Sequence, residues 1–252
     1  MDSQERQPFL GHLEELRKRL IACAVAAGIG FVVAYFFSEK LFHLLIMPLT
    51  KVMPEGDPLI FTNLPEMFIT YIKVSLITGI LAAAPVIFYE LWMFVAPGLY
   101  EKEKKHVVPF VISSTLLFVG GALFGYFVVF PFGFKFFMGF TNEYVKALPS
   151  VKQYFGFSIK LLLAFGLVFE LPVVIFFLTK IGVITTDLLK RKRKYAILLT
   201  FAVAAILTPP DVVTQFMMAG PLILLYEIGI LVSRLARKDK SDVDETAAVE
   251  PS

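Results

Sequence analysis

Long apolar segments separated by short polar ones run through most of the chain. A helix needs roughly 20 apolar residues to cross a bilayer, and the pattern contains about six segments of that kind. They lie at Leu20–Phe37, about Tyr71–Val95, Val107–Phe130, about Phe157–Thr179, Tyr195–Leu207 and about Val212–Val232. The pattern therefore predicts an all-α integral membrane protein with six transmembrane helices.

Positive charges alternate between the segments that connect these spans. Of the 24 Lys and Arg residues, 17 lie before the first span, in the second-to-third and fourth-to-fifth connections, and after the sixth span. Because Lys and Arg are enriched in cytoplasmic loops, both termini are predicted to be cytoplasmic. The first apolar run is longer than the core of a secretory signal and no small-residue cleavage site follows it. We therefore expect it to be retained as a span.

Composition agrees with a membrane protein. The chain is 57% hydrophobic and 18% charged, with a mean hydropathy of +0.74, whereas a soluble domain is about 45–50% apolar and about 25% charged. Cys23 is the only cysteine, and His12, His43 and His106 are scattered, without the spacing of metal ligands. No disulfide, metal, cofactor or nucleic-acid partner is expected.

The predicted spans and loops are unequal. The first outer loop, about Ser38–Ile69, is rich in proline and is expected to be structured on the membrane surface; the second is about Pro131–Gly156. The fifth apolar run would span about 20 Å as a helix, against a hydrocarbon core of about 30 Å, and Gln215 interrupts the start of the sixth. We expect a concave bundle with short fifth and sixth helices over residues 1–238, and a disordered cytoplasmic tail over 239–252.

Glu170 lies near the middle of the fourth predicted span. A charged carboxylate at that depth costs a few kcal/mol. Pro172 cannot donate a hydrogen bond to the carbonyl group of Val168, so the helix is predicted to bend there. Two interpretations remain open: a buried glutamate that caps freed backbone or bonds a neighbouring helix, or a functional intramembrane acid.

Two further acids lie beside spans on the predicted cytoplasmic side. The simpler interpretation pairs Glu15 with Arg19 at i,i+4 and leaves Glu103 in a solvated turn. Alternatively, the two carboxylates could hold a pair of arginines through bidentate contacts. In the turn Thr208–Asp211, Asp211 is predicted to cap the last helix, while Gln215 could hydrogen-bond a partner helix within lipid.

Four motifs occur together and in order. They are His-Leu-x-Glu-Leu-Arg-x-Arg at His12–Arg19, Trp-x-Phe-x-Ala-Pro-x-Leu-Tyr-x-x-Glu at Trp92–Glu103, Phe-Glu-x-Pro at Phe169–Pro172 and Thr-Pro-Pro-Asp at Thr208–Asp211. Over roughly residues 8–238 the chain resembles TatC, the large integral subunit of the bacterial twin-arginine protein translocase.

The resemblance implies a receptor for the twin-arginine signal peptides of folded cargo, in the inner membrane, which works with TatA and TatB and self-associates. Export is expected to use the proton gradient, since the sequence contains no phosphate-binding glycine loop. Glu15 and Glu103 are implied to contact the two arginines. The same patch would include Arg17, Phe94, Pro97, Leu99 and Lys105, where Lys105 keeps the charge of an arginine common in relatives but lacks its planar fork. Glu170 is implied to face a membrane-open concavity and, with Thr208, Asp211 and Gln215, to contact partner helices. Pro48 and Phe68 match functional positions of the first periplasmic loop.

Three rival functions are a small-solute transporter, an intramembrane enzyme and a passive assembly scaffold, and the scaffold shares the docking of partners with the receptor. A proton-coupled transporter of small solutes could use Glu170 as its proton carrier, but no repeat links the two halves of the chain. An intramembrane enzyme would need a catalytic constellation, and the sequence shows neither a metalloprotease motif nor paired membrane aspartates. The chain is therefore predicted not to be an enzyme.

Overall fold

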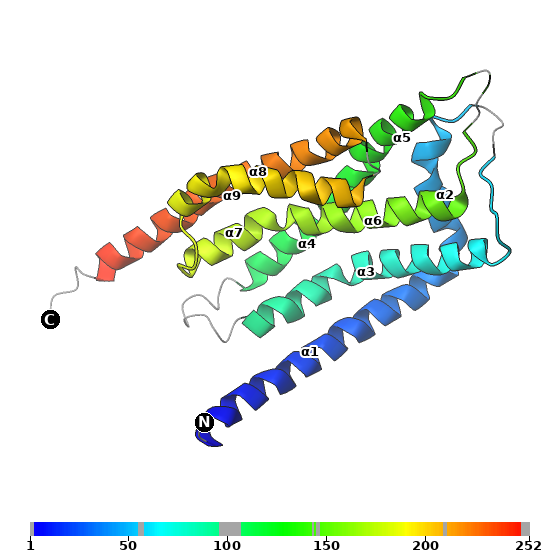
Figure 1. The fold of residues 1–252 in the computed structure, drawn as a ribbon. Helices are drawn as coiled ribbons and strands as arrows, with labels where there is room; N and C mark the ends of the chain where they lie inside the picture. Colours follow the sequence, from blue (N-terminus) through cyan, green and yellow to red (C-terminus); the bar gives the residue numbers. More distant parts are fainter. Residues whose placement is uncertain are drawn as a thin grey trace. The chain divides into compact units, whose positions relative to one another are not determined.

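The computed structural model describes residues 3–54, 58–95, 107–142, 144, 147–208 and 211–247, and the side chains of those between 11 and 236. The described chain forms two compact units, Met1–Val119 with Phe130–Ile159 and Gly120–Val129 with Lys160–Ser252, whose elements are drawn in Figure 1. The elements are α1 (Ser3–Phe36), α2 (Ser38–Thr50), α3 (Glu66–Val95), α4 (Val107–Phe124), the π-helical turn η3 (Gly125–Val129), α5 (Phe130–Met138), α6 (Val151–Phe169), α7 (Leu171–Lys180), α8 (Thr186–Leu207) and α9 (Val212–Ala247).

In the first unit, α1 packs along α3 (Figure 1). The two backbones meet at a pair of glycines: a Cβ atom on Gly30 would lie 2.6 Å from the carbonyl oxygen of Gly79, and one on Gly79 would clash with the backbone nitrogen of Phe31. Small residues allow this close approach, which is how helices associate in lipid, where no hydrophobic effect draws them together. The glycine pair therefore determines where α1 and α3 cross.

The first outer loop is structured, as predicted. Its helix α2 buries Leu45 and Pro48, and the Tyr154 hydroxyl donates a hydrogen bond to the carbonyl oxygen of Leu45 at 2.5 Å. Further along the loop, Ile60 pairs with Ser150 in an isolated parallel bridge. The loop is thus held against the start of α6, within the first unit.

In the second unit, α9 packs against α7 and α8. The hydroxyls of Thr186 and Ser233, both buried, lie 2.9 Å apart, and the Tyr226 hydroxyl donates to the carbonyl oxygen of Leu189 at 2.8 Å. These contacts satisfy polar groups inside the protein, which matters because unpaired groups are costly in lipid.

Five helical segments among the described residues are long and apolar enough to cross a membrane. They are Gly11–Phe36, Glu66–Val95, Val107–Met138, Val151–Lys180 and Val212–Ala236. The expected all-helical membrane architecture is confirmed. Helix α8 does not qualify because charged residues fill its first half, Thr186–Lys194. Its apolar second half is the short fifth span of the prediction, so the count of six spans and the concave shape stay predictions.

Three expectations about boundaries are wrong. The sixth helix is not short: its apolar part alone is 25 residues long. The Phe-rich segment expected to form the second outer loop is instead largely α5, because the helix continues from α4 through η3 past Pro131. Helix α6 begins at Val151, ahead of the predicted start near Phe157. Helix α9 extends to Ala247, and the division of the chain at residue 238 and the disorder of the tail stay predictions.

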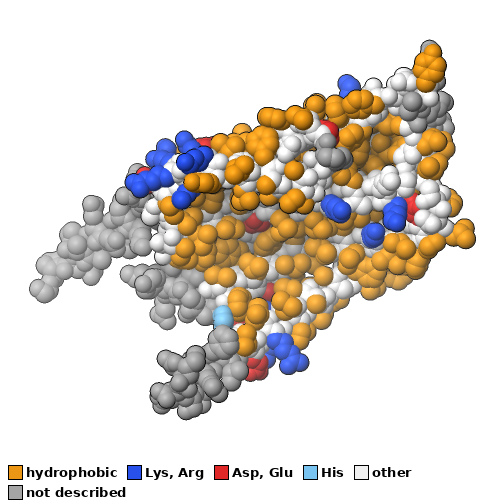
Figure 2. Space-filling view, in the orientation of Figure 1, with side chains coloured by type: hydrophobic (Ala, Val, Ile, Leu, Met, Phe, Trp, Pro, Cys, Tyr) orange, Lys and Arg blue, Asp and Glu red, His pale blue; other side chains and the backbone are white. Residues whose placement is uncertain are grey.

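The outer surface of the helices is apolar. On α1, Ile29 is 62% exposed and Phe36 83% exposed, and 6% of the most apolar stretch of this helix is buried. Figure 2 shows hydrophobic side chains spread over the visible face, with Lys and Arg gathered in a few places. Such an apolar surface is unfavourable in water and suits contact with lipid.

Candidate functional site

A cluster of two acids and one arginine joins α1 to α3. The guanidinium of Arg19 donates to Glu15 from Nε at 3.0 Å and from Nη2 at 2.6 Å, and Nη1 donates to Glu90 Oε2 at 2.9 Å. The predicted pairing of Glu15 with Arg19 is confirmed. The cluster carries a formal charge of about −1 because two carboxylates share one guanidinium.

The three side chains of the cluster are partly accessible to solvent. Their exposed fractions are 21% for Arg19, 32% for Glu15 and 19% for Glu90. One helical turn places Glu15 next to Arg19, and the packing of α1 on α3 brings Glu90 to the same guanidinium. The cluster is therefore both a tie between two helices and a place where carboxylates hold an arginine.

Phe94 lies beside the α1 motif. Its ring stacks on that of His12, with centroids 4.4 Å apart and planes 20° from parallel. Arg17 lies on the same stretch of α1 and is exposed. The structure thus brings Glu15, Arg17 and Phe94, all predicted site residues, to the adjoining ends of α1 and α3.

The remaining residues of this predicted patch lie outside the described residues. They are Pro97, Leu99, Glu103 and Lys105, all within 96–106. The helix ends on either side are described: the buried Trp92 ring stacks on Phe110 with centroids 4.7 Å apart, and its Nε1 donates to Ser114 Oγ at 3.3 Å. Whether Glu103 approaches Glu15 stays a prediction.

Glu170 occupies the break between α6 and α7. The first helix ends at Phe169 and the next begins at Leu171, with Pro172 near its N-terminus. The helix is thus interrupted where the bend was predicted, and the bend itself stays a prediction. The Glu170 carbonyl oxygen still accepts a hydrogen bond from the Val174 backbone at 2.9 Å. Because its side chain is only 8% exposed, Glu170 is enclosed by protein; its contact with partner helices stays a prediction.

The turn before α9 is held by hydrogen bonds within the chain. Asp211 accepts from the Thr214 backbone at 2.7 Å and from its hydroxyl, so the predicted N-terminal cap is confirmed. Thr208 bonds back to the carbonyl oxygen of Ala204 at 2.9 Å. Gln215 donates to the carbonyl oxygen of Phe201 on α8 at 3.1 Å. This bond satisfies a polar side chain at the start of the sixth helix from within the chain.

The two predicted loop positions differ in exposure. Pro48 is buried inside α2, where it packs as part of the loop core. Phe68 lies in the first turns of α3 and is 58% exposed. Both belong to the first unit, but of the two only Phe68 has an exposed side chain.

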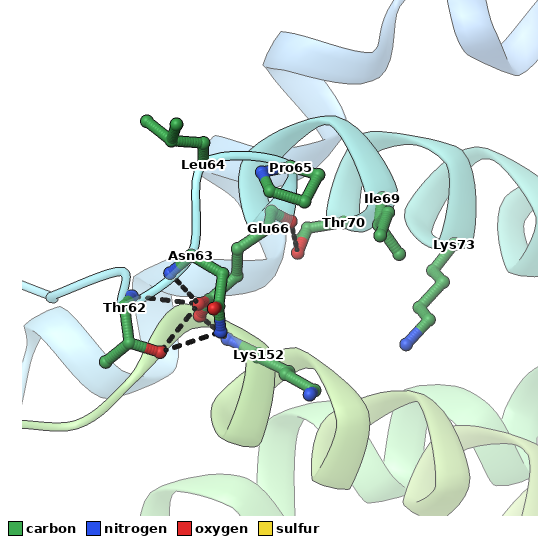
Figure 3. A pocket seen from close by; sticks show the side chains of 9 residues that line it. All are labelled: Thr62, Asn63, Leu64, Pro65, Glu66, Ile69, Thr70, Lys73 and Lys152. Atoms are coloured by element: carbon green, nitrogen blue, oxygen red, sulfur yellow. Dashed lines mark hydrogen bonds between the residues drawn. The ribbon is translucent and has the colours of Figure 1, made fainter.

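Sequence reasoning missed Glu66, an acid whose two carboxylate oxygens both accept several hydrogen bonds. Its Oε2 accepts from the backbone and hydroxyl of Thr62 at 2.9 and 3.3 Å and from the Asn63 backbone at 3.3 Å. Its Oε1 accepts from the Ser150 hydroxyl at 3.0 Å and the Lys152 backbone at 2.7 Å. Figure 3 shows the contacts from Thr62, Asn63 and Lys152 meeting at the Glu66 carboxylate. Glu66 therefore joins the first outer loop to the start of α6.

The sequence signals for the missed acids were weak. Glu66 stands at the start of an apolar run, as acids near helix N-termini often do. The sequence does not show which distant residues donate hydrogen bonds to it. Glu90 is a single charge within the second predicted span, and its partner Arg19 is 71 residues away. Among the described residues, no group of three or more His, Cys, Asp and Glu side chains is arranged to hold a metal.

Comparison with known proteins extends the resemblance to specific relatives. The family described as Sec-independent protein translocase protein (TatC) matches residues 11–221. The TatC protein of Desulforapulum autotrophicum is 55% identical over 249 residues, covering 99% of this chain and 92% of that protein. That of Escherichia coli is 40% identical over 234 residues, covering 93% and 91%.

A solved structure has the same fold. It is described as "Crystal Structure of Twin Arginine Translocase Receptor- TatC", with a TM-score of 0.80 and 44% identity over 90% of this chain and 99% of that one. The match agrees with the multi-pass helical architecture. The relatives are protein translocase components rather than enzymes. The chain therefore belongs to the TatC family of Sec-independent protein translocase proteins.

Proposed function

We propose that this chain is the receptor for twin-arginine signal peptides in a bacterial translocase that exports folded proteins. The observation that carries the proposal is the guanidinium of Arg19, which lies between Glu15 and Glu90. An internal arginine already occupies the kind of site that an arginine of a signal peptide would need. The family membership and the solved receptor of similar fold give the proposal its context.

In this mechanism the signal peptide competes with Arg19 for Glu15. One peptide arginine forms a charge-assisted pair with Glu15, and the second pairs with Glu103 from the neighbouring segment. Arg17 and Lys105 repel other basic segments, and Phe94 offers an apolar surface beside the acids. Pro97 and Leu99 complete this patch as apolar contacts for the peptide.

The remaining parts of the proposal concern the membrane. Both termini lie in the cytoplasm, so that the α1–α3 cluster of Glu15, Arg19 and Glu90 meets cargo before export. TatA and TatB bind near Glu170, Thr208, Asp211 and Gln215, several copies of the chain associate, and the proton gradient drives export. Pro48 and Phe68 act from the periplasmic loop. The bonds of Asp211 and Gln215 within the chain mean that a partner helix would have to exchange with them or bind alongside.

Charge reversal tests the proposal. Purified protein in lipid nanodiscs carrying Glu15→Lys and Glu103→Lys is expected to lose binding of a fluorescent twin-arginine peptide, while Glu14→Lys, an exposed neighbour on α1, keeps it. A twin-lysine peptide checks that geometry and not charge alone is recognised. Undiminished binding by the double variant would remove these acids from the site.

A liposome assay tests the rival transporter. Protein reconstituted alone is expected to move no small solute in response to a proton gradient. Uptake of a solute without twin-arginine cargo, lost in a Glu170→Gln variant, would favour the transporter instead.

A further inference from the structure

A cavity of about 500 Å³ opens beside the start of α3 in the first unit. Its lining comes from the first outer loop, the first turns of α3 and the start of α6. The lining residues are Thr62, Asn63, Leu64, Pro65, Glu66, Ile69, Thr70, Lys73 and Lys152. The volume lies within the range of small-ligand sites, about 300–1,000 Å³. No role assigned to the chain so far uses this cavity.

The electrostatic character of the cavity is positive. Two lysines and one glutamate line it, but both oxygens of Glu66 already accept hydrogen bonds from the loop and from α6. Within the described chain, the ammonium groups of Lys73 and Lys152 form no ion pair, and both side chains are exposed. Figure 3 shows them extending from α3 and α6 into the space between the two helices. The charge of the cavity therefore favours an anionic ligand.

The position of the cavity indicates which anion. Glu66 begins an apolar segment long enough to cross a membrane, and Lys73 lies about 10 Å further along that helix. On the same face of α3, Ile69 lies four residues before Lys73 and Leu76 three residues after it, and their apolar side chains are 43% and 47% exposed. A lysine so placed directs its ammonium group towards the headgroup layer while its stem stays in lipid. Leu64, 93% exposed at the rim, adds apolar surface for an acyl chain.

We propose that the cavity between the first outer loop, α3 and α6 binds the phosphodiester headgroup of an anionic phospholipid through Lys73 and Lys152. Basic recesses between transmembrane helices bind such headgroups elsewhere. A zwitterionic choline lipid fits less well because its quaternary ammonium group would face two cations. The bound lipid joins α3 to α6 on the side opposite the α1–α3 cluster of Arg19, Glu15 and Glu90, near Phe68.

Lipid binding to the full-length protein tests the proposal. Detergent-purified protein is titrated with phosphatidylglycerol, with phosphatidylcholine of the same acyl chains, and separately with inorganic phosphate, and adducts are counted by native mass spectrometry. The compared variants are Lys73→Gln with Lys152→Gln, the charge-retaining Lys73→Arg with Lys152→Arg, and the matched control Lys40→Gln with Lys51→Gln. The control removes two exposed lysines that lie outside the cavity.

The expected result is a preference for phosphatidylglycerol that weakens about tenfold to thirtyfold in the cavity Gln variant, because each lysine near an anionic lipid contributes roughly fivefold. The Arg variant and the control keep the preference, and thermal unfolding shows that all variants remain folded. An unchanged preference in a folded cavity Gln variant would overturn the proposal. Inorganic phosphate that binds as well as phosphatidylglycerol and displaces it would overturn the assignment to lipid and leave a soluble phosphate as the ligand.

Discussion

The α1–α3 cluster of Glu15, Arg19 and Glu90 ties two helices together and, in the proposal, holds an arginine of the signal peptide. Replacing Arg19 by Gln separates these two roles. The substitution removes the guanidinium that bonds Glu15 and Glu90 and retains much of the side-chain stem. Helix α1 loses a polar tie to α3, although the contact at Gly30 and Gly79 remains. The two carboxylates become available to an arginine from outside.

The size of the effect follows from the exposure of the groups. Their side chains are between about one fifth and one third exposed, so solvent screens the pairs, and an ion pair of this kind contributes about 0–1 kcal/mol. An incoming arginine no longer has to displace an interaction of about 1 kcal/mol at Glu15. We therefore expect the affinity for a twin-arginine peptide to rise about fivefold in Arg19→Gln.

Fluorescence anisotropy with a labelled twin-arginine peptide measures this change, and a matched control is available one residue away. Lys18 pairs with Glu14 at 2.9 Å, and their side chains are 73% and 66% exposed. The variant Lys18→Gln loses the same charge from the same helix but frees no acid of the cluster. It is expected to leave peptide affinity within about twofold of the unaltered protein. If Arg19→Gln bound the peptide no better than Lys18→Gln, with both folded, Arg19 would not be a competitor for the signal peptide.

Two further predictions concern stability, measured by thermal unfolding in detergent. Gly79→Leu is expected to destabilise the protein by about 1–3 kcal/mol or more, because its Cβ would meet the backbone of Phe31. The control Gly28→Leu, with open space around it, is expected to be tolerated. Equal unfolding temperatures of the two variants would refute the close crossing of α1 and α3 at Gly30 and Gly79. Glu66→Ala leaves several donors unpaired, at about 1–3 kcal/mol for each that is buried. Glu66→Ala is expected to lower the free energy of unfolding by about 3 kcal/mol in total. The control Glu39→Ala, at an exposed position on α2, is expected to have little effect. A stable Glu66→Ala variant would show that other contacts hold the first outer loop.

The presence of most helices was predictable from the local pattern of apolar residues, but the residues at which the helices begin and end were less predictable. Apolar runs predicted most spans, since lipid requires them to be long and continuous. The segment after Pro131 was expected to leave the helix, yet the π-helical turn Gly125–Val129 lies just before it. Such wide turns accommodate local irregularity and have no clear sequence signal. The helix thus continues past Pro131 as α5, which the sequence pattern did not predict.

In the candidate site, contacts between residues close in sequence were predictable, whereas contacts between distant residues were not. Glu15 with Arg19, and Asp211 as a cap, depend on residues within one turn of each other and were predictable. Glu90 and Glu66 depend on partners 71 and 86 residues away, so only the packing of helices and loops reveals them. Glu103 lies outside the described residues, and its approach to Glu15 stays a prediction.

Photocrosslinking from position 94 tests the receptor proposal most directly. A photoreactive phenylalanine in place of Phe94, beside His12, is expected to crosslink to a twin-arginine signal peptide. The crosslink is expected to disappear with a twin-lysine peptide and in the Glu15→Lys variant. The same group at Tyr89, an exposed aromatic position on α3, serves as the control and is expected to crosslink weakly. Equal crosslinking from both positions, or none from position 94 while the peptide still binds, would contradict a binding site at the α1–α3 cluster.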